Sequence, residues 1–426
     1  MTRVGTQQSR GVPRGWWPLL AVGGLYTLSA VIIAAWRADP ASTSDFRDFW
    51  ENAVHFRQSG EISDALGVHN YLPFFTIFML PWGFLPLRLA AALFVLLSLV
   101  LFGVSAALIE NLLADGWGRR PRPAMIAALL LMLPYVHTCA VLGNLGLLVL
   151  FLVVAAWFLV ERGRDWAAGL TLGLAILIKL LPVVLLAFFA FQRRWRVVGA
   201  ALAVTVVLGL GVPLMAIGGR ETLAQHRAFY QRAVRDHSAF VTLTSDQPRK
   251  TLYSNNAVPM VLRRLLSPTD AAPGRPAGRL LVNVGNAAPG LRLATYGALM
   301  CILIGASVLV TLYRRPSWPP VSIAEGRRLR WQYGVWCGLM LLAAPLLWTH
   351  YLPLIYWPLA LLTDAVERGR RVAHRVDRTA LVALGLWLLA AVLLLWPAAR
   401  AAGAQIVAVL AVWLAGLRHA LRVAGD

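Results

Sequence analysis

Long apolar runs separated by basic loops constrain this sequence more than any other feature. Several runs hold roughly 20 residues with hardly any charge, the length that a helix needs to cross ~30 Å of hydrocarbon. Inside a bilayer the backbone must satisfy its own hydrogen bonds, which favours helices. With 59% hydrophobic and 14% charged residues, the chain is too apolar for a soluble globular protein. We therefore predict an all-α polytopic membrane protein with a single domain over residues 1–426.

The basic loops predict the order of the membrane spans, because Lys and Arg accumulate in short cytoplasmic loops. The first span follows basic residues without a signal-peptide cleavage site, so we expect it to stay in place with a cytoplasmic N-terminus. The net charge of +21 is nearly all Arg and gathers at span ends, which indicates topology and anionic lipid headgroups and argues against nucleic acid. Placing the basic loops on one side requires about twelve spans, at residues 16–36, 88–113, 124–141, 145–161, 166–178, 181–192, 196–217, 292–313, 331–347, 351–364, 380–397 and 402–418.

Three of the apolar segments are short for a bilayer. Residues 166–178 and 181–192 would each be only ~20 Å long as helices, which predicts a thinned membrane or a cavity between their tips. Residues 72–86 contain three prolines and are expected to lie at the interface or to re-enter the membrane.

This topology brings the unusual polar residues of the chain to one side. The outer side receives the loops 37–87 and 218–291, together with the turns at Asn144, Lys179 and His350. The loop 218–291 is too long for the charge rule, so its Arg residues are interpreted as a surface for anionic groups. These polar residues are not part of the basic loops that define the topology. Their convergence on the outer side therefore predicts one functional site on the outer face.

After the first span, three acidic residues stand within seven positions, in a chain with only 19 Asp and Glu. Asp45 and Asp48 would share one face of a helix, and Glu51 follows them. Acidic residues are costly near a bilayer, so such a cluster is typical of a functional site. A local explanation stays open, in which Ser44 or Asp45 caps the helix and acids favour its first turn.

Two cationic candidates interrupt apolar segments. Lys179 stands just before Pro182, and it either reaches the interface from a span end or binds a phosphate or carboxylate. His350 either hydrogen-bonds at the interface or serves an anionic group or a proton. Its neighbours Trp348 and Tyr351 either anchor in the interface or stack on a sugar ring.

The long loop carries a second group of candidates. Asn255 and Asn256 precede an amphipathic stretch that contains Arg263 and Arg264. Ser254 or Asn255 would cap that helix, whereas a functional site would use the amides for sugar hydroxyls and an Arg for phosphate.

Other features have simpler interpretations. Gly143 and Asn144 form most simply a tight turn. The cysteines at 139, 301 and 337 lie in apolar runs and are expected to be packing residues, with no disulfide or metal role. The sequence contains no glycine-rich phosphate loop and no metal-ligand His/Cys spacing.

The order and spacing of these segments resemble glycosyltransferase family 87, within the GT-C superfamily. Leu72 stands where the family has the first Pro of a Tyr-Pro-Pro segment, and Tyr351 stands where it has a second His. The segments that carry the resemblance are Ser44 to Ala53, Tyr71 to Pro73 with Pro81 and Pro86, Gly143 to Gly146, Arg162 to Arg196, Ser254 to Pro259 with Arg263, and Ala344 to Tyr351.

The resemblance implies a polyprenyl-phosphate sugar donor, often mannosyl, and a lipid-linked or glycan acceptor of the cell envelope. It implies a GT-C type helical bundle in the cytoplasmic (inner) membrane of a bacterium, with an extracytoplasmic cavity. It places Asp45 at the position of the catalytic acid residue, and we expect this carboxylate to be the general base of an inverting transfer, with Asp48 as a second carboxylate. We expect the donor phosphate to contact Lys179, His350, Arg263 and Arg264, and the sugar or acceptor to contact Glu51, Asn144, Tyr71, Asn255, Asn256, Trp348 and Tyr351.

No cofactor is expected, because fixed cations would stabilise the phosphate, although Asp45, Asp48 and Glu51 leave a divalent metal conceivable. The competing hypothesis is a lipid or glycolipid transporter or flippase, which also uses short broken helices. A transporter would be expected to carry paired inverted halves and charges deep in several spans, which this sequence does not show. A non-catalytic assembly subunit is the third possibility.

Overall fold

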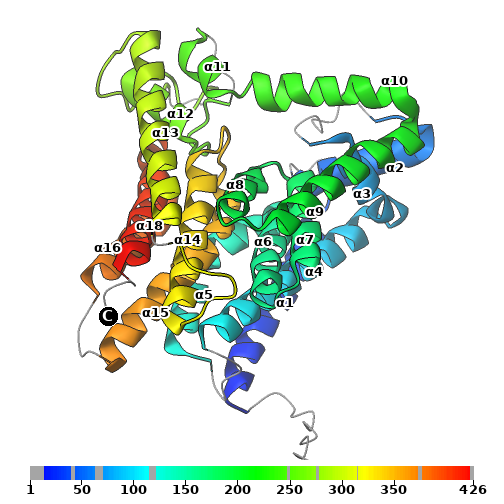
Figure 1. Cartoon of the computed structure of the whole chain (residues 1–426). Coiled ribbons are helices and arrows are strands. Elements are labelled where there is room, and N and C mark those ends of the chain that lie inside the picture. Colours follow the sequence, from blue (N-terminus) through cyan, green and yellow to red (C-terminus); the bar gives the residue numbers. More distant parts are fainter. Residues whose placement is uncertain are drawn as a thin grey trace, which may run out of the picture.

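The computed structural model describes residues 14–39, 44–62, 71–114, 121–246, 250–274, 278–313, 315–372 and 377–422. The described residues form helices and connecting loops, and their extended pairing consists of one bridge between Asn255 and Trp348. The predicted all-α polytopic membrane fold is confirmed (Figure 1).

Seven helical runs of the described residues are long and apolar enough to cross a membrane. They are α1 (Trp17–Arg37), α4 (Leu87–Leu113), α5 (Pro123–Leu142), the run Trp195–Arg235, α13 (Pro289–Leu312), the run Arg378–Leu395 and α18 (Ala404–Arg422). Four shorter apolar helical segments are Pro73–Phe84, α6 (Gly146–Glu161), α7 (Asp165–Ile178) and Leu181–Phe191.

The remaining helices complete the bundle and its loops. They are η1 (Arg14–Trp16), α2 (Asp45–Ser59), α11 (Ala239–Thr244), α12 (Val258–Leu266), α14 (Ile323–Leu342), η7 (Thr349–Ile355), α15 (Tyr356–Val372) and α17 (Pro397–Ala401). Helices occur at the predicted spans, but a count of twelve crossings is not confirmed. One predicted span is shifted: residues 331–347 were expected, whereas α14 begins at Ile323 and ends at Leu342, before the loop that carries Trp348.

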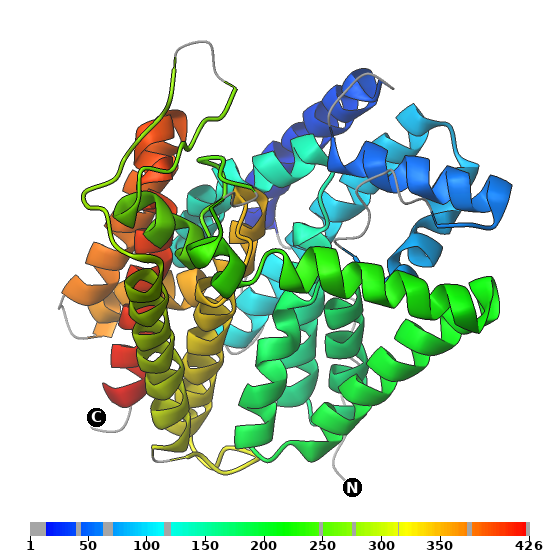
Figure 2. The ribbon, with the colours of Figure 1, turned by 90° about the horizontal axis from the view of Figure 1, so that it is seen from above.

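Two buried helices form the centres of two groups. α6 packs against α4 and α7, and its face from Gly146 to Val160 is almost wholly buried. α14 packs against α18, α15, α13 and α8 (Val184–Phe191), and every residue from Trp331 to Leu342 is buried. Seen from above, the C-terminal helices, coloured yellow to red, lie on one side and the blue N-terminal helices on the other, whereas the green helices α11 and α12 lie with the C-terminal group, where they contact α13 (Figure 2).

Small residues let α7 approach α9 (Trp195–Val206) closely. A Cβ on Gly169 would lie 2.4 Å from the carbonyl oxygen of Val197, and one on Gly173 would lie 2.8 Å from that of Ala201. Close backbone contact through small residues is the usual way in which membrane helices associate. This contact holds the short helix α7 in place, and Lys179 follows directly after α7.

The run Trp195–Arg235 bends sharply at Gly218. It consists of α9, a π-helical turn at Val207–Gly211 (η5), α10 (Val212–Phe229) and a second π-helical turn at Tyr230–Arg235 (η6). Gly218 has φ 77° and ψ 166°, a backbone conformation essentially restricted to glycine. The predicted end of this span at residue 217 agrees with the bend, and beyond it α10 lies across the ends of the other helices (Figure 1).

Ion pairs join neighbouring helices of the bundle. Arg122, just before α5, lies 2.8 Å from Glu110 near the end of α4 and 2.5 Å from Asp364 in the middle of α15. Arg330 pairs with Glu161 at 2.8 Å. Paired and largely buried charges of this kind fix the register of neighbouring helices.

Candidate functional site

Helix α2 presents two carboxylates on one face. The Ser44 hydroxyl accepts a 3.2 Å hydrogen bond from the Arg47 backbone N–H, so Ser44 caps the helix and the two acids occupy its first turn. The predicted capping of this helix by Ser44, with acidic residues in its first turn, is therefore confirmed. Asp45 and Asp48 also line a cavity of about 540 Å³, so the cap and the cavity use the same turn. Phe46 and Phe49 are buried and fix the helix against the bundle.

Asp45 is held by an asparagine from the turn between α5 and α6. Asn144 Nδ2 donates a 2.7 Å hydrogen bond to Asp45 Oδ2, and Asn144 Oδ1 accepts one of 3.0 Å from the Gly146 N–H. The second bond orients the amide so that its nitrogen faces the carboxylate. Gly143 has φ 61°, and a Cβ there would lie 2.5 Å from Phe46, so the predicted tight turn needs glycine.

Burial raises the pKa of Asp45 above its ordinary value. The hydrogen bond from Asn144 and the positive charges of Lys179 and Lys250 act in the opposite direction and only partly offset this effect. The pKa of Asp48 is also raised, first by burial and then by the negative charges of Asp45 and Glu51, with Arg47 opposing. A carboxylate with a raised pKa is a better proton acceptor, which suits general-base chemistry.

Lys179 lies in the break between α7 and the short 3₁₀ turn Leu181–Val183 (η4). It has an extended backbone, and its side chain is buried at 6% exposure. Its Nζ lies 3.2 Å from the centre of the Tyr351 ring and has no hydrogen-bond partner among the described residues. A buried ammonium with unused donors needs an anionic partner, so this position fits a phosphate.

The segment after α14 supplies the opposite wall. His350 Nε2 lies 3.9 Å from Asp45 Oδ2, and its backbone oxygen accepts the Cys139 thiol at 2.9 Å. A Cβ on Gly146 would lie 2.4 Å from that same oxygen, so glycine permits this close approach. Tyr351 packs edge-on against the His350 ring. The two walls therefore meet through backbone contacts around His350.

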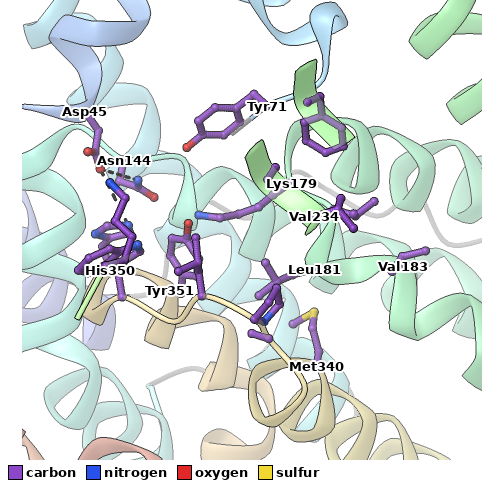
Figure 3. A pocket seen from close by; sticks show the side chains of 18 of the residues that line it. Asp45, Tyr71, Asn144, Lys179, Leu181, Val183, Val234, Met340, His350 and Tyr351 are labelled. Atoms are coloured by element: carbon purple, nitrogen blue, oxygen red, sulfur yellow. Dashed lines mark hydrogen bonds and ion pairs between the residues drawn. The ribbon is translucent and has the colours of Figure 1, made fainter. Parts of the chain in front are cut away.

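The cavity has a polar part and an apolar part (Figure 3). Asp45, Asn144, Tyr71 and His350 gather at one end, and Lys179 lies between them and the apolar side chains. The apolar lining is formed by Leu180, Leu181, Val183, Val184, Phe229, Ala233, Val234, Met340, Ala343, Ala344, Pro345 and Leu346. Leu180 and Val183 are 42% and 40% exposed, so the apolar part reaches the protein surface. Such a cavity suits a ligand with a polar head and a hydrocarbon tail.

Eight of the thirteen residues singled out from the sequence line this cavity: Asp45, Asp48, Tyr71, Asn144, Lys179, Trp348, His350 and Tyr351. Glu51 is not among the lining residues and pairs with Arg47 at 2.6 Å. Tyr71 stacks on Phe75, which fixes its ring at the cavity wall.

The structure places the other four candidates in the packing beside the cavity. Arg263 donates to the Thr242 carbonyl at 2.8 Å, and Arg264 is fully buried with hydrogen bonds to backbone carbonyls. Asn255 and Asn256 are fully buried as well. Most of their polar groups bind the chain itself, which differs from the contacts expected from the sequence, whereas Asn256 Oδ1 and Arg264 Nε have no hydrogen-bond partner among the described residues.

Asn255 also differs from its expected capping role. Helix α12 begins at Val258 with Ala257 at the N-cap position and no side-chain cap. Asn255 Oδ1 instead accepts hydrogen bonds from the Ala257 and Leu347 N–H groups, both at 3.2 Å. Asn255 therefore ties the long loop to the segment that carries Trp348.

Lys250 is a lining residue that the sequence reasoning missed. It stands in a polar loop beside Arg249, where a further cation attracts no notice. Its available signal was composition, because the chain contains only two lysines, Lys179 and Lys250.

Cysteines and metal ligands contribute little to the cavity. Cys139 and Cys337 are buried as expected, whereas Cys301, on α13, is exposed. Within the described ranges, no group of three or more His, Cys, Asp or Glu is arranged to hold a metal ion.

The chain has recognisable relatives. The model of glycosyltransferase family 87 matches residues 69–345. An alpha-(1->3)-arabinofuranosyltransferase of Mycobacterium tuberculosis is 29% identical over 41% of this chain and 42% of its own length. Its namesake in Corynebacterium glutamicum is 26% identical over 47% and 46% of the two chains. A polyprenol-phosphate-mannose-dependent alpha-(1-2)-phosphatidylinositol mannoside mannosyltransferase of Mycolicibacterium smegmatis is 30% identical over 33% and 34%. The matched regions thus span less than half the length of these curated relatives.

Proposed function

Because the chain belongs to glycosyltransferase family 87, we propose that its cavity transfers a sugar from a polyprenyl-phosphate donor to a hydroxyl group of a lipid-linked or glycan acceptor. The observation that carries this proposal is one cavity that combines Asp45, an apolar wall and a Lys179 ammonium with no hydrogen-bond partner among the described residues. The name of one relative includes a polyprenol-phosphate-mannose donor, which supports the same donor class here.

The donor phosphate lies beside Lys179 in this proposal. The sugar then points toward Asp45, and the polyprenyl chain follows the apolar residues toward the exposed Leu180 and Val183. The ring of Tyr351 under the ammonium holds Lys179 in place by a cation–π contact. His350 faces the carboxylate and contributes a further donor at the polar end.

Asp45 acts as the general base of a single displacement. Its carboxylate takes the proton of the acceptor hydroxyl, and the acceptor oxygen forms a bond with the anomeric carbon. The bond from that carbon to the phosphate oxygen breaks, and polyprenyl phosphate leaves with the electron pair. One displacement inverts the anomeric centre, whereas a double displacement requires a nucleophilic carboxylate, for which Asp48 is the neighbouring candidate.

We expect the transferred sugar to be a hexose, namely mannose, and this identity stays a prediction. Two of the relatives are named for arabinofuranose, a pentose, and one for mannose. The cavity chemistry described above concerns the phosphate and the base and serves either sugar.

We place the cavity on the extracytoplasmic face of a bacterial cytoplasmic membrane, with the N-terminus in the cytoplasm. The support is the distribution of charge. Arginine-rich segments stand at the N-terminal ends of α5, α7, α9 and α14, whereas the cavity residues nearest to α5, α7 and α14 stand at or after their C-terminal ends. Labelling single cysteines at Lys250 and Arg196 with an impermeant reagent on intact cells tests it. Labelling at Arg196 with protection at Lys250 would reverse the assignment.

Purified protein incubated with polyprenyl-phosphate mannose and polyprenyl-phosphate arabinofuranose tests the function. We expect acceptor-dependent release of polyprenyl phosphate from one of them, with an inverted anomeric centre in the product. A transporter would leave the donor bond intact. If the protein consumed a nucleotide sugar and neither lipid donor, the proposal would be contradicted.

A further inference from the structure

The two lysines of the chain line the same cavity. The other 38 of its 40 Lys and Arg residues are arginines. Lysine carries a compact charge with three donors on a flexible stem, which suits an oxygen whose charge changes during a reaction. Lys179 already has a place in the proposed function, and Lys250 has none.

Lys250 is held in a defined backbone conformation. Its φ is 59°, a left-handed value that costs a non-glycine residue free energy and persists where surrounding structure enforces it. Its carbonyl oxygen accepts a 3.1 Å hydrogen bond from Asn255 Nδ2, and Asn255 also binds the Leu347 N–H. The loop that presents Lys250 is therefore tied to the segment that carries His350.

A buried guanidinium strengthens the same loop. Arg264 donates to the carbonyl oxygens of Leu252 at 2.9 Å and Asn255 at 2.7 Å. These contacts consume polar groups that were candidates for ligand binding. Their structural effect is to fix the path of the loop on either side of Asn255 and so to limit where Lys250 can reach.

Lys250 and Lys179 act on the same carboxylate from different parts of the chain. Both positive charges lower the pKa of Asp45 against the larger opposite effect of burial, so both lie within electrostatic reach of it. Lys179 is buried, whereas the side chain of Lys250 is exposed and keeps its hydration. An exposed ammonium on a flexible side chain can follow a group that moves within its reach.

The charge of the lipid phosphate rises during the proposed reaction. A sugar linked through polyprenyl phosphate is a phosphodiester with one negative charge, and the leaving group is a monoester whose charge approaches two. One cation suits the donor, but the departing phosphate needs a second. A contact that forms mainly as this charge develops accelerates the reaction, since it stabilises the transition state more than the bound donor.

We propose that Lys250 binds the departing phosphate and stabilises the second negative charge that appears as the sugar–phosphate bond breaks. The inference rests on the proposed function and assigns Lys250 a role separate from that of Lys179. Lys179 binds the phosphate in the donor and in the product, whereas Lys250 binds it in the transition state and the product.

The test compares Lys250→Met with wild type and with Arg220→Met, which removes an exposed cation outside the cavity lining. Three quantities are measured: donor affinity, affinity for polyprenyl monophosphate without turnover, and kcat. We expect Lys250→Met to lower kcat and monophosphate affinity by roughly 10- to 100-fold, as for loss of a charged hydrogen bond, with donor affinity within about twofold. Lys250→Arg should recover most of both losses, and Arg220→Met should resemble wild type.

The outcomes separate the two proposals. Equal loss of donor and monophosphate affinity, or no loss of either, overturns the role of Lys250 even if the wild type transfers sugar. Selective loss of monophosphate affinity in a protein that transfers no sugar supports the Lys250 site and removes the proposed function. Failure of the wild type to bind polyprenyl monophosphate overturns both.

Discussion

The side-chain amide of Asn144 donates a 2.7 Å hydrogen bond to the carboxylate of Asp45, although the two residues are 99 positions apart in the sequence. This contact joins α2, which follows the first span, to the turn between α5 and α6. It orients the carboxylate toward the cavity and influences its proton affinity, because a hydrogen bond to the charged form favours that form.

The acid limb of the pH profile should report Asp45. A general base works only when deprotonated, so the rate falls as the pH drops through its pKa. Burial raises the pKa of Asp45, and we therefore expect the limb above the ordinary value of about 3.9. Asn144→Ala removes a contact that lowers this pKa, so the limb should move to higher pH.

The profile is measured as kcat/KM for the donor against pH, with Asn283→Ala as the control. Asn283 is an exposed amide outside the cavity lining. An acid limb that stays in place in Asn144→Ala, or moves to lower pH, would show that another group controls it.

Replacing Lys179 should separate function from stability. Lys179→Met keeps an unbranched side chain but removes the charge, and we expect donor affinity to fall by roughly 10- to 100-fold. The thermal unfolding temperature should hold or rise, because the ammonium is buried without a hydrogen-bond partner among the described residues. Donor titration and a melting curve in the same detergent check both points, and unchanged donor affinity would remove Lys179 from the phosphate site.

Helix packing predicts a contrast between two glycines of α7 and α9. A Cβ at Gly169 would lie 2.4 Å from a backbone oxygen of the neighbouring helix, whereas one at Gly199 has nothing within 4 Å. We expect Gly169→Ala to destabilise the protein by about 1–3 kcal/mol through overpacking. Gly199→Ala should be neutral or slightly stabilising, since alanine favours helix.

Unfolding of both variants in one detergent gives the answer. Equal stabilities for Gly169→Ala and Gly199→Ala would mean that α7 and α9 are not held at the described distance. Because Lys179 follows α7, Gly169→Ala is also expected to reduce transfer.

The helices were predictable because their signal is local. An uninterrupted apolar run predicts a helix whatever surrounds it, and the break at Lys179 and the end of the span near Gly218 followed from Pro182 and from composition. The meeting of Asp45, Asn144, Lys179 and His350 was also predictable, since alternation of basic loops places their turns at one end. The number of membrane crossings was not predictable, because the length and composition of a helix of intermediate length do not show whether it crosses the membrane.

The loop contacts could not be derived from the sequence. Arg263 and Arg264 lie on an amphipathic helix, a pattern that suits a phosphate and equally suits buried carbonyl groups. The deciding information is the path of residues 250–256, which exists only once the chain is folded. The same path brings Lys250 to the cavity and explains why its role was missed.

The central claim is tested most directly by measuring the release of polyprenyl phosphate by wild type, Asp45→Asn and a control, Glu61→Gln. Glu61 is an exposed carboxylate that follows α2. The account predicts that Asp45→Asn binds the donor as wild type does and transfers its sugar about 10²- to 10⁴-fold more slowly, the usual contribution of a general base, while Glu61→Gln keeps full activity. Transfer by Asp45→Asn at the wild-type rate would contradict it.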